Sequence, residues 1–312
     1  MARVLLFGQA QFGERTLAGL LERGHDVLAA CVPPDRDGRP ADPLKAAAEA
    51  AGVPVIQRKS YRSAEAFAEV AAERADIGVL AFVTQIIPAV ILDAPRRASV
   101  CFHPSLLPAY RGGSAINWQL IHGETRGGIT LFRPDDRIDA GPIYLKKEIE
   151  IGLDDSAGSF YYARVFEPGI EATLEAVDLV LGGMEGVPQN EADATHDPLC
   201  RDEHAGIDWS QPTSVLHNLI RGCDPAPGAH AVYEGKRLRF YGSRKGASGR
   251  VDDPGTVVAV GEQGIEIATG DGTLVLGKMA AGGKKVTAAE AADEIDLAAR
   301  AGLESAARPR GA

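Results

Sequence analysis

The sequence has few cysteines, and their spacing pairs none of them. Its 312 residues include Cys31, Cys101, Cys200 and Cys223 and contain no C-x-x-C motif. A disulfide framework or a zinc site needs cysteines that are clustered or regularly spaced. We therefore expect neither, and this cysteine usage fits a reducing cytoplasm.

Long apolar stretches are also missing. No stretch reaches the roughly eighteen apolar residues of a membrane-spanning helix. The apolar start of the chain, residues 4–7, is interrupted by Gly8, so we interpret it as a first strand and not as a signal peptide. We expect a cytoplasmic protein without a membrane segment.

Positive charge and cofactor motifs are scarce as well. The formal net charge is −10, which disfavours a strong non-specific grip on nucleic acid. Residues 8–13 contain neither G-x-G-x-x-G nor the lysine of a Walker A loop, so no nucleotide cofactor is expected. The seven histidines show no H-E-x-x-H spacing, so no metal is expected either.

Apolar runs alternate with helical patterns through the first third of the chain. Strands are predicted at residues 4–7, 26–31, 53–56, 77–82 and 99–102, and helices at 14–23, 42–51 and 64–71. This alternation predicts an α/β fold: a Rossmann-like, doubly wound, mostly parallel sheet with helices on both faces. In such sheets ligands bind beyond the carboxyl ends of the strands.

The remainder of the chain predicts a change of architecture. A helix with Ser114 as its N-cap is predicted first, followed by two strands, a long helix at residues 160–181 and a Gly- and Pro-rich linker at residues 182–198. Several short strands separated by turn signals, among them residues 238–241, then predict a small C-terminal β-barrel of the OB type. The last twenty residues are expected to be helical. We predict two domains, residues 1–203 and 204–312.

Two polar groups stand out against this framework. His103 directly follows a predicted strand and opens the turn HPSLLP, and Asp139 lies in the glycine-terminated loop DDRIDAG. A histidine that is oriented by a carboxylate is the minimum apparatus for moving a proton during acyl transfer. We predict His103 and Asp139 as a catalytic pair, and interpret Asp135 and Asp136 as turn residues.

Several motifs resemble those of the 10-formyltetrahydrofolate-using formyltransferases and hydrolases. They are FHPSLLP at residues 102–108, RGGSAINW at 111–118, the aspartate loop at 135–141, and IDW at 207–209 with PAPG at 225–228. PPDRDG at 33–38 and TQIIP at 84–88 are similar to the hydrolase domain of 10-formyltetrahydrofolate dehydrogenase. AGGKK at 281–285 is instead similar to methionyl-tRNA formyltransferase.

The resemblance implies a formyltransferase fold that uses 10-formyltetrahydrofolate as formyl donor, releases tetrahydrofolate and needs no metal. It assigns the acid–base work to His103 and Asp139. It also implies that Gln85, Ile86 and Ile87 bind the pterin ring, together with Asp139. A loop at a strand end can offer backbone groups to the edge of a flat heterocycle and isoleucines to its face.

The resemblance points less specifically to three residues on the substrate or oxyanion side: Cys101, Arg111 and Ser114. Cys101 stands where amine formyltransferases of this family carry an asparagine that stabilises the oxyanion. A thiol is a weak donor, and losing one good donor typically costs ~3 kcal/mol of transition-state stabilisation. The hydrolase branch also lacks that asparagine, which agrees with the similarity to the dehydrogenase. By itself Cys101 is interpreted as a buried, inert strand residue.

The acceptor of the formyl group is the open question. We predict an amine on a small metabolite or sugar. The alternatives are water, which would release formate, a carrier-bound thiol, and charged initiator tRNA, the last disfavoured by the charge balance. A folate-binding regulator without activity is disfavoured because both His103 and Asp139 are present. A nicotinamide-binding Rossmann protein would bind NAD tightly.

Overall fold

The computed structural model describes residues 1–72, 74–249 and 252–306. The chain divides into two compact units. The first comprises Met1–Gly113, Gly127–Ile149 and Ala163–His196, and the second comprises Ser114–Arg126, Glu150–Tyr162 and Asp197–Ala312. Two short segments from the first half of the chain thus group with the C-terminal residues. The single boundary between residues 203 and 204 stays a prediction.

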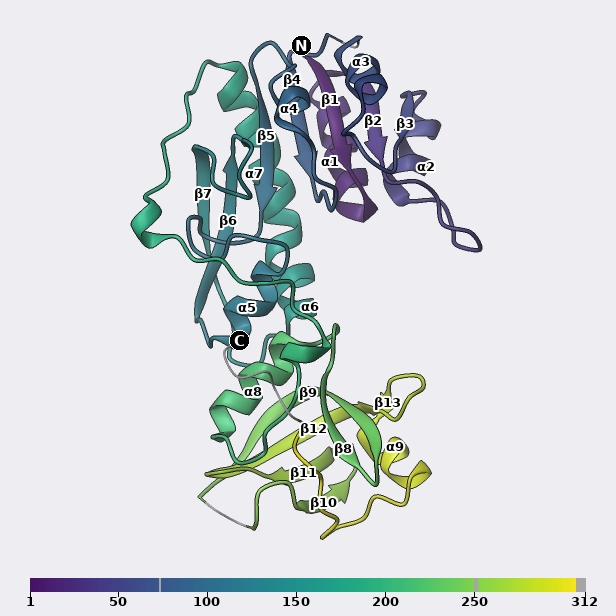
Figure 1. The fold of residues 1–312 in the computed structure, drawn as a ribbon, viewed down its shortest axis with the longest axis vertical. Coiled ribbons are helices and arrows are strands. Elements are labelled where there is room, and N and C mark those ends of the chain that lie inside the picture. Colours follow the sequence, from purple (N-terminus) through teal and green to yellow (C-terminus); the bar gives the residue numbers. More distant parts are fainter. Residues whose placement is uncertain (73, 250–251, 307–312) are drawn as a thin grey trace. The chain divides into compact units, whose positions relative to one another are not determined.

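The first unit is built on a seven-stranded sheet with the strand order β3-β2-β1-β4-β5-β6-β7 (Figure 1). The pairs β2–β3, β1–β2, β1–β4 and β4–β5 are parallel, and β5–β6 is antiparallel. The strands are β1 (Arg3–Gly8), β2 (Asp26–Val32), β3 (Val55–Gln57), β4 (Ile77–Ala81), β5 (Ala98–His103), β6 (Arg126–Phe132) and β7 (Ile143–Glu150).

Helices cover both faces of this sheet, as doubly wound sheets require. On one face, Phe12 of α1 contacts Phe102 of β5 and Phe166 of α7, with ring centroids 4.4 and 5.9 Å apart. On the other face, Leu5 and Phe7 of β1 share a buried cluster with residues of α3 and α4. The helices are α1 (Ala10–Glu22), α2 (Pro43–Ala50), α3 (Ala64–Ala72), α4 (Ala89–Leu92) and α7 (Phe166–Leu181).

The second unit contains an antiparallel sheet in the order β10-β11-β12-β9-β8, with β13 paired to β12. Its strands are β8 (Ala229–Tyr233), β9 (Lys236–Ser248), β10 (Val257–Gly261), β11 (Gly264–Ala268), β12 (Gly272–Ala280) and β13 (Val286–Thr287). Its helices are α5 (Ala115–Ile121), α6 (Ala157–Phe160), α8 (Thr213–Gly222) and α9 (Ala288–Glu294). A mostly parallel sheet with helices and a separate C-terminal antiparallel sheet confirm the predicted fold class.

The C-terminal segment closes the edges of the second sheet. Val232 of β8 exchanges two backbone hydrogen bonds with Glu304, and Val257 of β10 donates one to Ala301. Because unpaired strand edges expose backbone donors and acceptors, this pairing protects both edges at once. The prediction of a helix over the last twenty residues is therefore wrong for this segment: the alanines favour a helix, but backbone pairing with β8 and β10 holds the segment extended. Residues 307–312 lie outside the described residues.

The segment predicted as one long helix at residues 160–181 is interrupted near its start. A π-helical turn at Tyr161–Val165 joins α6 to α7. The strand predicted at residues 238–241 extends much further, because β9 continues through polar residues to Ser248. The side-chain pattern does not predict either difference. In both places the contacts of the backbone with neighbouring segments determine the structure.

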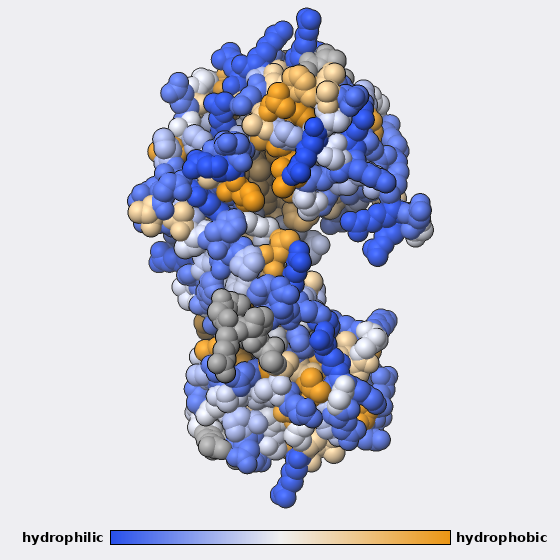
Figure 2. All heavy atoms as spheres, viewed as in Figure 1, coloured by the Kyte–Doolittle hydropathy of each residue, from blue (hydrophilic) through white to orange (hydrophobic). Residues whose placement is uncertain are grey.

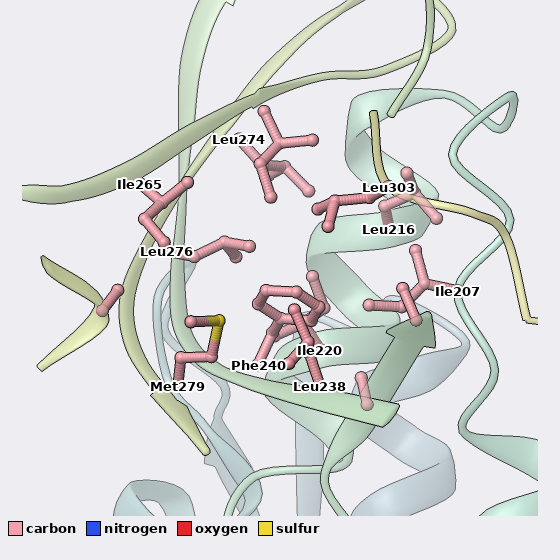
Figure 3. Close-up of a cluster of buried hydrophobic side chains, with 14 of the residues drawn as sticks. Ile207, Leu216, Ile220, Leu238, Phe240, Ile265, Leu274, Leu276, Met279 and Leu303 are labelled. Atoms are coloured by element: carbon pink, nitrogen blue, oxygen red, sulfur yellow. The ribbon is translucent and has the colours of Figure 1, made fainter. Parts of the chain in front are cut away.

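The core of the second unit is a dense apolar cluster between the sheet and α8. Figure 3 shows Phe240, Leu238 and Leu276 pointing toward Leu216 and Ile220 of α8. The Phe240 side chain is fully buried, and its ring contacts Trp209 edge-on at a centroid distance of 5.8 Å.

Substitution Phe240→Ala should therefore lower the free energy of unfolding by about 3–5 kcal/mol, because it removes buried aromatic surface and leaves a cavity. Urea unfolding followed by tryptophan fluorescence measures this loss. Val260→Ala, at a partly exposed position of β10, is the control, with an expected change of about 0.5 kcal/mol or less. Equal losses in the two variants would contradict the assignment of Phe240 to the core.

Candidate active site

Strand β5 brings His103 to the carboxyl edge of the first sheet. It pairs with β4 on one side and β6 on the other, and His103 lies opposite Thr130 of β6. Because side chains alternate along a strand, the preceding residue, Phe102, points to the other face and packs on Phe12 with ring centroids 4.4 Å apart. The position of His103 is thus fixed by a buried aromatic contact one residue earlier.

The turn after His103 is held by hydroxyl groups. Thr130 Oγ1 accepts a hydrogen bond from the Leu107 N–H (3.1 Å) and donates one to the Ser105 carbonyl (2.7 Å). Ser105 Oγ donates to the Ala109 carbonyl at 2.7 Å. These bonds fold the SLLP segment back, so that the following residues return toward the histidine ring.

Both ring nitrogens of His103 face acceptors. Nε2 lies 2.8 Å from the Tyr110 carbonyl oxygen, and Nδ1 lies 3.5 Å from Asp139 Oδ2. A carbonyl only accepts, so the Nε2 atom carries a hydrogen. In the neutral ring Nδ1 would then be a lone pair facing a carboxylate, whereas in the imidazolium both nitrogens donate. The ring of His103, which is 5% exposed, is therefore held between a backbone carbonyl and a carboxylate.

The loop that carries Asp139 is folded back onto the histidine turn. Asp139 Oδ2 accepts a hydrogen bond from the Gly112 N–H at 2.8 Å, so one carboxylate oxygen serves both the backbone and His103. Asp139 has a φ of +52°, a left-handed conformation that aspartate tolerates better than most residues. A Cβ atom on Gly141 would lie 1.8 Å from the Arg133 carbonyl oxygen, so only glycine fits there. The structure thus brings together the two residues predicted as the catalytic pair.

The guanidinium of Arg111 contacts other residues of the protein and is not open to bind an anion. It is almost buried and donates to Gln189 Oε1 at 3.2 and 2.8 Å and to the Glu191 carboxylate at 2.9 and 3.1 Å. Its contacts therefore lie within the protein, on the segment that follows α7.

Ser114 stands at the N-cap position of α5, as predicted, but its hydroxyl accepts a hydrogen bond from the Cys200 N–H at 3.0 Å and makes no cap bond to the helix. Ser114 and Cys200 both belong to the second unit, whereas His103 and Asp139 belong to the first. The assignment of Ser114 to the substrate or oxyanion side stays a prediction.

The three predicted pterin-binding residues follow β4 and differ in exposure. Gln85 Nε2 donates to the carbonyls of Arg58 and Lys59 at 2.8 and 3.2 Å. Ile87 is buried in the core, whereas Ile86 is 65% exposed. Gln85 and Ile87 line a small recess together with residues at the ends of β1 and β2. Figure 2 shows apolar side chains gathered in a hollow on the face of the molecule that carries these strands.

The Cys101 thiol has low nucleophilic reactivity. Burial, and next the nearby charge of Asp139, raise the pKa of Cys101 well above its usual value. Its sulfur lies 3.7 Å from the Phe102 carbonyl oxygen. A thiol held neutral is a poor nucleophile. It lies on the same strand face as His103, two residues earlier, and offers at most a weak hydrogen bond to substrate.

Metal-binding clusters and membrane-spanning helices are absent from the described part of the chain. Within residues 1–72, 74–249 and 252–306, no group of three or more His, Cys, Asp and Glu side chains is arranged to hold a metal ion. In the same described parts of the chain, none of the helices has the length and apolarity needed to cross a bilayer.

Two contributors to the site were not found from the sequence. Gln189 contacts both Arg111 and the backbone of the Asp139 loop, and Asp42 contacts the start of α1. The first is a neutral amide in a segment that was interpreted only as a linker. The second has a recognisable local signal, Asp before Pro at a helix start, but that signal predicts only the cap of α2.

Comparison with known families identifies the class. A family model described as formyl transferase matches residues 2–177, and one described as formyl transferase, C-terminal domain, matches residues 200–294. Together they span most of the chain, which therefore belongs to the formyl transferase family. The predicted family membership is confirmed.

Two curated relatives represent the two branches noted in the sequence. Mitochondrial 10-formyltetrahydrofolate dehydrogenase of Mus musculus is 42% identical over 250 residues, which cover 77% of this chain but only 27% of that protein. Methionyl-tRNA formyltransferase of Geobacter metallireducens is 36% identical over 293 residues, which cover 92% of this chain and 93% of the relative. The chain thus spans about a quarter of the first protein and nearly all of the second.

Among solved structures, the N-formyltransferase of Helicobacter canadensis in complex with folinic acid and dTDP-3-aminofucose has a TM-score of 0.68 at 16% identity. The match covers 88% of this chain and 98% of that one. At this identity the likeness concerns the fold. The family is a folate-using one, which agrees with the donor predicted from the sequence.

Proposed function

We propose that this protein transfers the formyl group of 10-formyltetrahydrofolate to an amine on a small metabolite or sugar and releases tetrahydrofolate. The observation that carries the proposal is the contact between His103 and Asp139 at the carboxyl edge of the sheet, with the ring nitrogens 2.8 and 3.5 Å from acceptors. The amine nitrogen attacks the formyl carbon, the bond from that carbon to N10 breaks, and N10 takes up a proton.

His103 has two tasks in this reaction. As an imidazolium it stabilises negative charge on the formyl oxygen as the tetrahedral intermediate forms. The proton on Nδ1, whose 3.5 Å approach to Asp139 is longer than a hydrogen bond, can then be passed to the departing N10, while the proton lost by the attacking amine restores the pair. Asp139 orients the ring by offering a carboxylate to Nδ1, and its left-handed backbone directs that carboxylate at the ring.

Folate binding draws support from exposed apolar side chains on two loops of the first unit. Ile86, after β4, is 65% exposed, and Ile138, next to Asp139, is 57% exposed. Large aliphatic side chains left in water gain free energy when a flat heterocycle covers them. We assign Gln85, Ile86 and Ile87 to the pterin ring, with Asp139 close to N10.

The reaction assay tests the proposal directly. The protein is incubated with 10-formyltetrahydrofolate, and tetrahydrofolate is followed with and without candidate amines while formate is measured in parallel. We expect turnover that depends on an amine and yields its N-formyl product. Stoichiometric formate without any amine would replace the transferase by the second candidate, a hydrolase, which the 42% identity to the dehydrogenase favours. No tetrahydrofolate under either condition would overturn both.

The position of the Asp42 carboxylate limits which formyl acceptors the protein can bind. The turn between β1 and α1 is the usual anion site of Rossmann-like folds, because backbone N–H groups and the helix dipole converge there. Here the Ala10 N–H, at the start of α1, donates to both oxygens of the Asp42 carboxylate at 3.0 Å. A carboxylate from the chain itself thus occupies a position where a phosphate would bind. This favours an acceptor without a phosphate at this turn.

Replacing Asp42 by asparagine should therefore strengthen binding of a nucleoside diphosphate by about tenfold, because a fixed negative charge is removed, equivalent to about 1.4 kcal/mol. Asparagine caps helices as well as aspartate does, so α2 should stay intact. Isothermal titration calorimetry measures the affinity, and Asp37→Asn, at an exposed position nearby in the sequence, is the control. Unchanged affinity in Asp42→Asn would remove this argument about the acceptor.

A further inference from the structure

Gln189 lies in the segment between α7 and a short 3-10 turn at Glu191–Asp193. Its side-chain amide nitrogen donates two hydrogen bonds, to the carbonyl oxygens of Asp139 and Gly141, each at 2.8 Å. The two carbonyls belong to the loop that places the Asp139 carboxylate against His103. One side chain therefore grips the catalytic loop on both sides of Ala140.

The other end of the same amide is held just as firmly. Gln189 Oε1 accepts from Arg111 Nε at 3.2 Å and from Arg111 Nη2 at 2.8 Å. Arg111 in turn is fixed by Glu191, at 2.9 and 3.1 Å. Glu191 is exposed, and the adjacent Arg111 guanidinium lowers the pKa of its carboxyl, so the carboxylate stays charged.

These contacts form a closed circuit. Arg111 directly precedes Gly112, whose N–H donates to Asp139 Oδ2 at 2.8 Å. The backbone that leaves the histidine turn and the aspartate loop are therefore joined by the Gly112–Asp139 bond and through Arg111 and Gln189. Glu191 adds a further link, because it accepts from both Arg111 and Arg137. The brace matters because Asp139 has a φ of +52°, a backbone conformation that persists only where the surroundings hold it.

We propose that Gln189, braced by Arg111, is a positioning residue for Asp139, which sets the distance between the carboxylate and the His103 ring. This inference rests on the proposed function only for its effect on turnover. It also gives Arg111 a role in place of direct substrate binding: its charge aligns the glutamine, whose two N–H groups then match the two loop carbonyls.

Two substitutions of Gln189 separate its donor and acceptor roles. Gln189→Glu keeps oxygen atoms for Arg111 but presents an acceptor to the two carbonyls, and Gln189→Leu removes both sets of bonds. We expect kcat for tetrahydrofolate release to fall by about 10²-fold in both, because small misplacements of catalytic groups have effects of this size. The KM for the folate should rise by a smaller factor than kcat falls, because Gln189 does not contact the loop of Gln85, Ile86 and Ile87. Gln263→Leu, in the exposed turn between β10 and β11, is the control.

Two readouts do not depend on turnover. Amide hydrogen exchange at Gly112 should accelerate in Gln189→Leu, because its acceptor on Asp139 is no longer held in place. The ¹⁵N chemical shifts of the His103 ring and their pH dependence should approach those of Asp139→Asn. Both readouts apply even to a protein that shows no formyl transfer, so a failure of the proposed function is distinguishable from a failure of this inference. Native-like exchange at Gly112 and native-like ring shifts in Gln189→Leu would overturn the inference, even if the variant lost stability.

Discussion

Replacement of His103 by alanine should lower the rate of tetrahydrofolate release by about 10³-fold, within the range measured for losing a general acid–base. The variant lacks the positive charge that stabilises the formyl oxygen and the group that returns a proton to N10. The effect should appear in kcat, because these interactions form in the transition state and contribute little to binding folate. Single-turnover kinetics with 10-formyltetrahydrofolate measure it.

Two further variants are needed to interpret the result for His103→Ala. His103→Gln keeps an N–H that can donate to the Tyr110 carbonyl but cannot carry a proton, so it should be nearly as slow as alanine. His122→Ala, at an exposed position on the second unit, should be close to native in rate. Equal thermal stability and equal folate affinity across the set would exclude misfolding. A native rate in His103→Ala would refute the catalytic assignment, whichever acceptor the protein uses.

The sheet and the choice of His103 and Asp139 as candidate site residues followed from the sequence for different reasons. The strands are buried on both faces, so their sequences are apolar along almost their whole length. Val79 and Leu80 belong to such a run. His103 and Asp139 were predicted because each lies in a loop with its own local motif. Their 3.5 Å approach, however, is a property of the fold.

The residues that hold the site could not be predicted in this way. Gln189 is 50 positions from Asp139, and the residues around it are those of an ordinary linker, so only the folded backbone shows what its amide contacts. Arg111 illustrates the opposite case, because an arginine beside a catalytic turn is compatible with both substrate binding and bracing. The choice between them depends on two partners, Gln189 and Glu191, that are distant in the sequence. A local pattern shows which chemical groups are present, and the tertiary contacts decide which of them remain available to a substrate.

Replacement of Asp139 by asparagine should lower kcat by about 10²–10³-fold while leaving the fold intact. Asparagine tolerates a left-handed backbone and can still accept the Gly112 hydrogen bond, so the loop should keep its shape. What is lost is the negative charge beside His103 Nδ1, which would stabilise positive charge on the ring in the transition state. Exchange of the Gly112 amide should therefore remain slow in this variant, in contrast to Gln189→Leu.

Asp139→Ala gives the comparison that separates charge from structure. It removes the charge, the acceptor for Gly112 and the tolerance of a φ of +52° together, so it should lose stability as well as turnover. Asp136→Asn, at an exposed position of the same loop, removes one charge without touching His103 and should behave like the native protein. If Asp136→Asn slowed turnover as much as Asp139→Asn, the general negative potential of the loop would explain catalysis, and the specific pairing of Asp139 with His103 would not. If only Asp139→Asn is slow and its Gly112 amide stays protected, the charge on that one carboxylate, in the position the loop gives it, accounts for the loss.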